Sequence, residues 1–329
     1  EKEREEKKQD APSQEVDEQK TCLELRNQGN NLYMKGLYYQ ACSVYSQAIS
    51  IGMFVDAKLQ SVLLNNRAAS LHKLNRLQEA YDDCRSAINL DGENGKAIAR
   101  GANYAGELGL FNESKELFKR ATQFFPESAD MVKSVKKMES LAEQVDKARS
   151  LLLDGEGSRA KACLREPLKS SPKSIEVMKL MVKAHHACGE HDEALRMCTA
   201  MEEKGQGDLE VKLLMSKSMA AGGRLQEAIA KMHEMLKLDP EYRDCKQELK
   251  DLKRMEEMRS RAEQLLRTRR FSESIELCSE ALRISSWATG FNAAVLLTRA
   301  SCWVELKSLE KAINDCSSSL DLNPRLVKA

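Results

Sequence analysis

The sequence repeats itself, and this repeat restricts the fold more than any other feature of the chain. Small and apolar residues return at a near-constant spacing, which starts with Gly29, Gly36, Ala41, Tyr45 and Ala48. When the central turn is aligned, eight units begin at residues 22, 61, 95, 141, 175, 209, 255 and 293. Such a period is typical of a solenoid, in which each unit packs only on its neighbours.

Each unit has the pattern of two helices. Apolar residues recur at the spacing of one helix face, and a glycine or polar turn separates a first helix from a second. Gly29 and Ala41 would let two helices approach closely, and Tyr38 and Tyr45 would fill the space between them. Because one helix pair cannot bury its apolar face alone, the pairs must stack. We therefore predict an all-α fold, a right-handed α-α superhelix (solenoid) with the first helices along its inner face.

Two steps between units are longer than the rest, and they divide the chain. Each of these steps is 46 residues long, against a basic period of 34. The extra residues fall around Glu127–Ser140 and Glu241–Arg254, two charged stretches without glycine that we predict to be capping or linking helices. The predicted arrays are residues 21–140 and 141–254, with three units each, and residues 255–329, with two units.

The two ends of the chain differ in composition and register from the repeats. Residues 1–20 are mostly charged and are expected to form a flexible tail, with a helix that folds on a partner as the alternative. The chain begins with Glu1, and Ala329 is the third residue of what would be a ninth unit. We therefore expect the natural protein to extend past both ends.

The composition argues against several classes of protein. The 52 basic and 51 acidic residues leave a net charge of +1, so the charge excess of a nucleic-acid-binding protein is missing. No apolar run approaches the roughly 20 residues of a membrane-spanning helix, and no secretory signal is visible. Phosphate loops and catalytic motifs are absent as well. We expect neither an enzyme nor a cofactor.

The cysteines indicate a reducing compartment. There are ten, without a Cys-x-x-Cys pair or a Cys/His cluster at zinc spacing. Several occupy helical positions that we expect to be buried, namely Cys84, Cys198, Cys278 and Cys316. We expect reduced, structural thiols in a protein of the cytoplasm, and also of the nucleus.

Five polar residues occupy groove-facing positions on the first helices of the first array: Arg26, Asn30, Asn66, Lys96 and Arg100. The residues that are four apart share one helix face. Three cations and two amides that converge from consecutive helices would accept paired carboxylates, such as those of a chain terminus that ends in Asp. After the cost of association, we expect micromolar affinity, or about 8 kcal/mol.

The repeat resembles the tetratricopeptide repeat (TPR) family over nearly the whole chain after about residue 21. The five groove residues resemble the two-carboxylate clamp of TPR co-chaperones, although Arg26 stands where that family more often has Lys. The resemblance implies binding to the C-terminal Glu-Glu-Val-Asp tails of the 70-kDa and 90-kDa heat-shock chaperones. Tyr33 matches a position where the family places an apolar or aromatic wall against the peptide, and helix packing would also explain it.

The layout in three arrays resembles nine-repeat J-domain proteins, which implies a J-domain after Ala329, and also thioredoxin-like plant relatives. The His-Pro-Asp motif of J-domains is absent from this chain, so we expect no ATPase stimulation by the chain alone. The resemblance allows client proteins as further partners. The alternative function is a scaffold that assembles a multiprotein complex through internal peptide segments.

The matching positions differ in the other arrays. In the third array they hold Arg259, Glu263, Thr298 and Lys328. The carboxylate of Glu263 would repel an anionic tail, so we expect no clamp there. In the second array Val145 supplies no donor beside Arg149, and its groove is expected to serve another partner or only spacing.

The second array contains two further groups of interest. His185, His186 and His191 cluster near a turn without a recognisable ligand spacing, and we expect exposed or helix-terminal histidines rather than a metal site. The array is also rich in methionine. Helical spacing favours a core role, and a methionine-lined groove for client segments is the alternative. The residues are Met178, Met181, Met215, Met219, Met232 and Met235.

Overall fold

The structure is a computed structural model that describes residues 11–51, 56–205, 207–285 and 287–323. Those residues form sixteen helices and no strand. The helices are α2 (Ala11–Met34), α3 (Tyr38–Ile51), α4 (Ala57–Lys73), α5 (Leu77–Leu90), α6 (Gly95–Leu108), α7 (Phe111–Phe124), α8 (Ala129–Leu153), α9 (Gly157–Ser170), α10 (Ile175–Ala187), α11 (His191–Glu203), α12 (Leu209–Ala221), α13 (Leu225–Leu238), α14 (Arg243–Arg267), α15 (Phe271–Ile284), α16 (Thr289–Glu305) and α17 (Leu309–Leu322).

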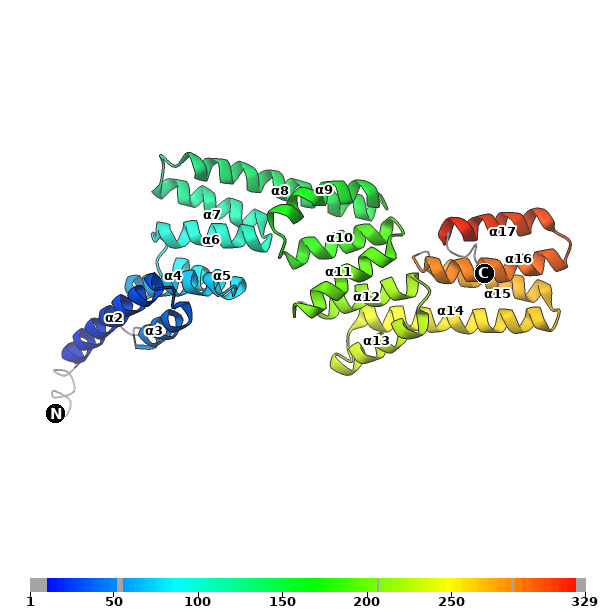
Figure 1. Cartoon of the computed structure of the whole chain (residues 1–329), viewed down its shortest axis with the longest axis horizontal. Coiled ribbons are helices and arrows are strands. Elements are labelled where there is room, and N and C mark those ends of the chain that lie inside the picture. The colour runs from blue at the N-terminus through cyan, green and yellow to red at the C-terminus, as the bar shows by residue number, and fades with distance from the viewer. Residues whose placement is uncertain (1–10, 52–55, 206, 286, 324–329) are drawn as a thin grey trace, which may run out of the picture. The chain divides into compact units, whose positions relative to one another are not determined.

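Within each compact unit, consecutive helices pack on one another as hairpins (Figure 1). The chain divides into two compact units. Unit 1 comprises residues 1–146 and 166–174, and unit 2 comprises residues 147–165 and 175–329. Helices α2 to α7 pack in sequence in unit 1, and helices α10 to α17 do so in unit 2. The predicted all-α solenoid of tandem helical hairpins is confirmed.

A left-handed residue joins the two helices of every predicted unit. These residues are Gly36, Asn75, Gly109, Gly155, Gly189, Gly223, Arg269 and Lys307, all with φ between 57° and 84°. Their spacing is the same as that of the units read from the sequence, so the predicted register is confirmed. The left-handed conformation ends the first helix and turns the chain into the second.

Close approach within the first hairpin depends on a small residue. A Cβ added at Gly29 would lie 2.5 Å from Cε1 of Tyr45, a contact that no side chain tolerates. Tyr45 and Ala41 are buried together in the core between α2 and α3. The predicted pairing of small residues with a large tyrosine is therefore what brings these helices together.

The two charged stretches between arrays are helical, but neither forms a separate helix. Residues 129–140 form the first part of α8, and residues 243–254 form the first part of α14. Each of these two helices is 25 residues long. Neither helix contains glycine or proline, the residues that would interrupt it. The division into three arrays stays a prediction.

The first described helix begins earlier than expected. Residues 11–20, which we expected in the flexible tail, belong to α2. Their Glu, Gln and Lys content favours helix, and Pro12 is tolerated in a first turn. Residues 1–10 of the expected tail lie outside the described residues.

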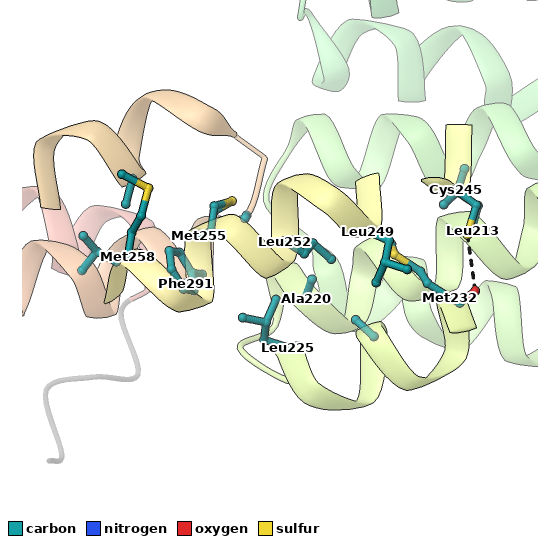
Figure 2. Packing of buried hydrophobic residues seen from close by; sticks show 14 of the residues in the cluster. Leu213, Ala220, Leu225, Met232, Cys245, Leu249, Leu252, Met255, Met258 and Phe291 are labelled. Atoms are coloured by element: carbon teal, nitrogen blue, oxygen red, sulfur yellow. Dashed lines mark hydrogen bonds between the residues drawn. The ribbon is translucent and has the colours of Figure 1, made fainter. Parts of the chain in front are cut away.

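The core of unit 2 is rich in sulfur and aliphatic side chains from α12, α13, α14 and α16 (Figure 2). Met232 and Met255 are fully buried, and Cys245 Sγ donates to the backbone carbonyl of Met232. Met181, Met215 and Met235 are buried too, while Met178 and Met219 pack against a core cluster. The core interpretation of the methionines is therefore confirmed.

All ten cysteines are free thiols. Cys84, Cys198 and Cys278 are buried, as expected, but the expectation for Cys316 is wrong because its side chain is exposed. It lies on the side of α17 that also exposes Leu309 and Ile313, where no other described helix covers it. None of the described helices is both long enough and apolar enough to cross a membrane.

Candidate functional site

The five predicted groove residues lie on the first helices of three consecutive hairpins of unit 1. Helix α2 carries Arg26 and Asn30, α4 carries Asn66, and α6 carries Lys96 and Arg100. The start of α6 is fixed by Asn94, whose Oδ1 accepts from the backbone N–H of Ala97 at 3.1 Å. Its Nδ2 donates to Oγ of Ser61 on α4 at 2.9 Å, which also links α6 to its neighbour.

The two amides contact each other. Asn66 Nδ2 donates to Asn30 Oδ1 at 3.1 Å, and the hydroxyl of Tyr45 donates to the same oxygen at 2.7 Å. Burial raises the pKa of Tyr45 to about 12, so this hydroxyl remains a donor at neutral pH. Because Oδ1 of Asn30 accepts twice, the amide orientation is fixed and its NH₂ group stays available as a donor.

Arg100 is anchored by a neutral partner. Its Nη1 donates to the backbone carbonyl of Asn65 at 2.7 Å and to Oδ1 of Asn65 at 2.6 Å. Asn65 is 4% exposed and therefore holds a defined position. The guanidinium is thus oriented while its positive charge is left uncompensated.

Lys96 and Arg100 line the same hollow. The hollow has a volume of about 450 Å³, and Lys96 is exposed at its wall without a hydrogen bond to another described residue. The other lining residues are His72, Ala99, Asn103, Tyr104, Glu107, Phe125 and Met131. Two cations thus line this hollow, and Arg100 connects it to Asn65, the neighbour of Asn66 on α4.

Arg26 is half-buried and lies about one turn before Asn30 on α2. Its Nη2 makes one long contact, 3.5 Å, with Oδ1 of its neighbour Asn27. No interaction within the described chain joins it to the amides or to the hollow. Across the described residues, none of the three cations Arg26, Lys96 and Arg100 forms an ion pair with a carboxylate.

Tyr33 is half-buried in the first hairpin. Its ring meets that of Tyr38 edge-on, with centroids 5.3 Å apart, and it packs against the core cluster of α2 and α3. Helix packing therefore accounts for its position. Its role as a wall against a peptide stays a prediction.

The arginine next to Asn66 has a structural role. Arg67 forms a bidentate ion pair with Asp83, with both nitrogen–oxygen distances 2.7 Å, and this pair ties α4 to α5. The last hairpin repeats the arrangement with Arg299 and Asp315 at 2.8 and 2.7 Å. These pairs stabilise hairpins and leave no charge for a ligand.

At the matching positions of the other arrays, the described residues are paired charges, an apolar side chain or a hydroxyl bonded to its own helix. Arg259 contacts Glu256 at 2.9 Å and Glu263 at 3.9 Å. Arg149 pairs with Glu176 at 3.2 Å, and Val145 is buried. Thr298 donates to a carbonyl of its own helix, and Lys328 lies outside the described residues.

The three histidines lie at helix ends, as expected, but His191 is buried rather than exposed. His186 Nε2 contacts Oγ of Ser218 at 2.9 Å, and His191 Nε2 contacts Oγ1 of Thr289 at 2.7 Å. These hydroxyls satisfy the imidazoles and so permit their burial. Burial lowers the pKa of His186 to about 4 and lowers the pKa of His191. The described residues contain no group of His, Cys, Asp or Glu arranged to hold a metal.

Two supporting residues of the site were missed by sequence reasoning. Asn65 is not among the residues singled out from the sequence, although a polar residue directly after Leu63 and Leu64 on a buried face is itself a signal. Tyr45 was assigned to packing, and its hydroxyl bond to Asn30 has no signal in the sequence.

Comparisons with known proteins agree with the fold. No family model matches the chain. It is 26% identical over 325 residues to the TPR repeat-containing thioredoxin TTL4 of Arabidopsis thaliana, covering 93% of this chain and 45% of that protein. It is 21% identical over 309 residues to the DnaJ homolog subfamily C member 7 homolog of Dictyostelium discoideum, covering 93% and 57%. The chain thus spans about half the length of these curated relatives.

A solved structure of another protein has a similar fold. The TPR domain of P58(IPK) superposes with a TM-score of 0.60 at 16% identity, covering 92% of this chain and 93% of that one. Both comparisons cover the repeats from end to end. The chain thus has the fold of a tetratricopeptide repeat domain, and over more than 90% of its length it is similar to a TTL protein and to DnaJ homolog subfamily C member 7 proteins.

Proposed function

We propose that this chain is a co-chaperone adaptor whose unit 1 binds the C-terminal Glu-Glu-Val-Asp tails of the 70-kDa and 90-kDa heat-shock chaperones. The site is the carboxylate clamp of Arg26, Asn30, Asn66, Lys96 and Arg100. One observation carries the proposal: Lys96 and Arg100 line one hollow, Arg100 is held by Asn65 next to the Asn30–Asn66 pair, and no carboxylate of the described residues forms an ion pair with either cation.

The proposed clamp distributes its donors over the two carboxylates of a terminal Asp. Lys96 and the free guanidinium edge of Arg100 would each form a charge-assisted hydrogen bond, worth about 1.5–3 kcal/mol. The free NH₂ group of Asn30 would donate to the same terminus. Arg26 would reach the site from α2 by a change of side-chain rotamer, because its one described contact is weak.

The names of the similar proteins support a co-chaperone function. Several of them bear the name DnaJ homolog subfamily C member 7, and they match more than 90% of this chain. We propose that the full-length protein couples the clamp to a J-domain, that it acts in the cytoplasm, and that this stretch performs no covalent chemistry. Client proteins are further proposed partners.

Calorimetric titration tests the proposal directly. A ten-residue peptide that ends in Glu-Glu-Val-Asp should bind with micromolar affinity, and its C-terminally amidated form should bind at least tenfold more weakly. Lys96→Ala should weaken binding by tenfold or more, since about 1.4 kcal/mol corresponds to a factor of ten. Lys119→Ala removes an exposed lysine of the same unit on α7 and should have no effect.

Equal binding of the free-acid and amidated peptides would refute the clamp. That result would support the alternative function, a scaffold that binds internal peptide segments. Binding of neither peptide would remove chaperone tails from the list of partners.

A further inference from the structure

The hollow beside the clamp carries opposite charges at its two ends. Lys96, Arg100, Asn103 and Glu107 follow one face of α6 at helical spacing, and all four line the hollow. Among the described lining residues, Glu107 contributes the one carboxylate, and it lies about two turns of helix beyond Arg100. A ligand that lies along α6 in this hollow would therefore contact the cations near the start of the helix and the carboxylate of Glu107 near its end.

Glu107 is held in place and yet accessible. Its two carboxylate oxygens lie 3.0 and 3.1 Å from Nε2 of His72 on α4. The His72 ring stacks on Tyr104 at a centroid distance of 4.5 Å, which fixes the imidazole. The Glu107 side chain remains 46% exposed, and no lysine or arginine in the described part of the chain pairs with it.

The spacing along α6 sets which part of a ligand reaches Glu107. An α-helix rises 1.5 Å per residue, so Glu107 lies roughly 16 Å along the axis from Lys96. An extended peptide advances about 3.3 Å per residue. If its terminal residue lies at Lys96, the residue about five positions upstream lies at Glu107.

We propose that Glu107, oriented by His72, is a specificity-determining residue that selects a basic side chain four to six residues before an acidic carboxyl terminus. This inference rests on the proposed function and names the class of tail that the clamp prefers. A basic side chain there would pair with Glu107, whereas an acidic one would be repelled. A ligand of this class matches both ends of the hollow.

An arginine scan tests this inference. The peptides end in Glu-Glu-Val-Asp and carry Arg, Gln or Glu at each of the three preceding positions. At one of these positions, Arg should bind about two- to fivefold more tightly than Gln, the scale of an exposed ion pair, and Glu should bind more weakly. Glu107→Gln should abolish the difference, and Glu107→Lys should reverse it.

The control is Glu116→Gln, which removes one exposed carboxylate from α7 outside this hollow and should keep the arginine preference. Equal binding of the Arg and Gln peptides, or a preference that survives Glu107→Gln, would overturn the inference while leaving the clamp intact. Failure of every peptide in the scan to bind would overturn the clamp and the inference together.

Discussion

At the scale of single residues, two adjacent asparagines on α4 position different parts of the proposed clamp. Asn66 donates to Asn30 across the groove, while the buried Asn65 accepts from Arg100. Neighbouring residues on a helix point about 100° apart, so one of them can face α2 while the other faces α6. Neutral amides therefore make the fixed contacts of the proposed clamp, and no carboxylate of the described residues forms an ion pair with its cations.

The hydroxyl of Tyr45 orients the amide of Asn30. The substitution of Tyr45 by Phe removes this hydroxyl and keeps the ring. We predict that Tyr45→Phe lowers the free energy of unfolding by about 1 kcal/mol, because a part-buried hydrogen bond is lost. Binding of the Glu-Glu-Val-Asp peptide should weaken several-fold, because the amide of Asn30 is then free to rotate. Tyr38→Phe, in the same hairpin, is the control. Unchanged affinity in Tyr45→Phe would show that Asn30 needs no positioning.

The half-buried His186 and the buried His191 predict that unit 2 is destabilised by acid. Burial lowers the pKa of His186 to about 4, whereas an unfolded histidine titrates near 6.5. The unfolded state therefore binds more protons, and stability falls as the pH drops from about 6.5 to about 4, by about 3 kcal/mol. The contribution is fully present above pH 6.5.

Denaturant unfolding at several pH values, followed by tryptophan fluorescence, measures this effect. Both tryptophans, Trp287 and Trp303, lie in unit 2 and report on its unfolding. His186→Gln should flatten the pH dependence, and the exposed His233→Gln should leave it unchanged. An equally steep profile in His186→Gln would place the acid sensitivity elsewhere.

At the scale of elements, the turns explain how much of the fold could be predicted. The residue that ends each first helix must adopt a left-handed conformation, and this requirement left glycines at a readable spacing. The turn fixes the phase of each helix, so the groove-facing positions of α4 and α6 could be counted from it. The absence of glycine and proline from the two charged stretches predicts helix, and the same absence explains why α8 and α14 continue through them without a break.

Three of the eight turns lack glycine, and two of these, at Arg269 and Lys307, could be stabilised by substitution. Arg269 and Lys307 adopt φ values of 61° and 57°, which disfavour residues with a Cβ. We predict that Lys307→Gly raises the free energy of unfolding by about 0.5–1 kcal/mol, because relief of strain exceeds the added entropy of the unfolded chain. Gly189→Ala, at φ 73° in open space, should lower it by about 1 kcal/mol. Denaturant unfolding measures both, and a loss of stability in Lys307→Gly would contradict the strain argument.

At the scale of the whole molecule, the hairpins share the contacts that stabilise them but differ in the residues at the positions that match the proposed clamp. The Arg67–Asp83 pair of unit 1 and the Arg299–Asp315 pair of unit 2 are nearly identical in geometry. Side chains that stabilise a hairpin thus recur, while those that face the groove do not. The register of the repeat gives only an expectation of which residues face the groove, and the ion pair that neutralises Arg259 depends on atomic distances that the structure supplies.

This difference predicts one tail-binding site per chain. Arg259 is held by Glu256 and Glu263, so a tail at the third array would have to displace a carboxylate and would meet another. Titration of the chain with the free-acid peptide should therefore give a stoichiometry near one. Lys96→Ala combined with Arg100→Ala should abolish binding, because no second clamp remains, and Arg259→Ala should leave affinity and stoichiometry unchanged. A stoichiometry of two, or binding that survives the double substitution, would mean that a groove with internally paired charges can still open to an anionic terminus.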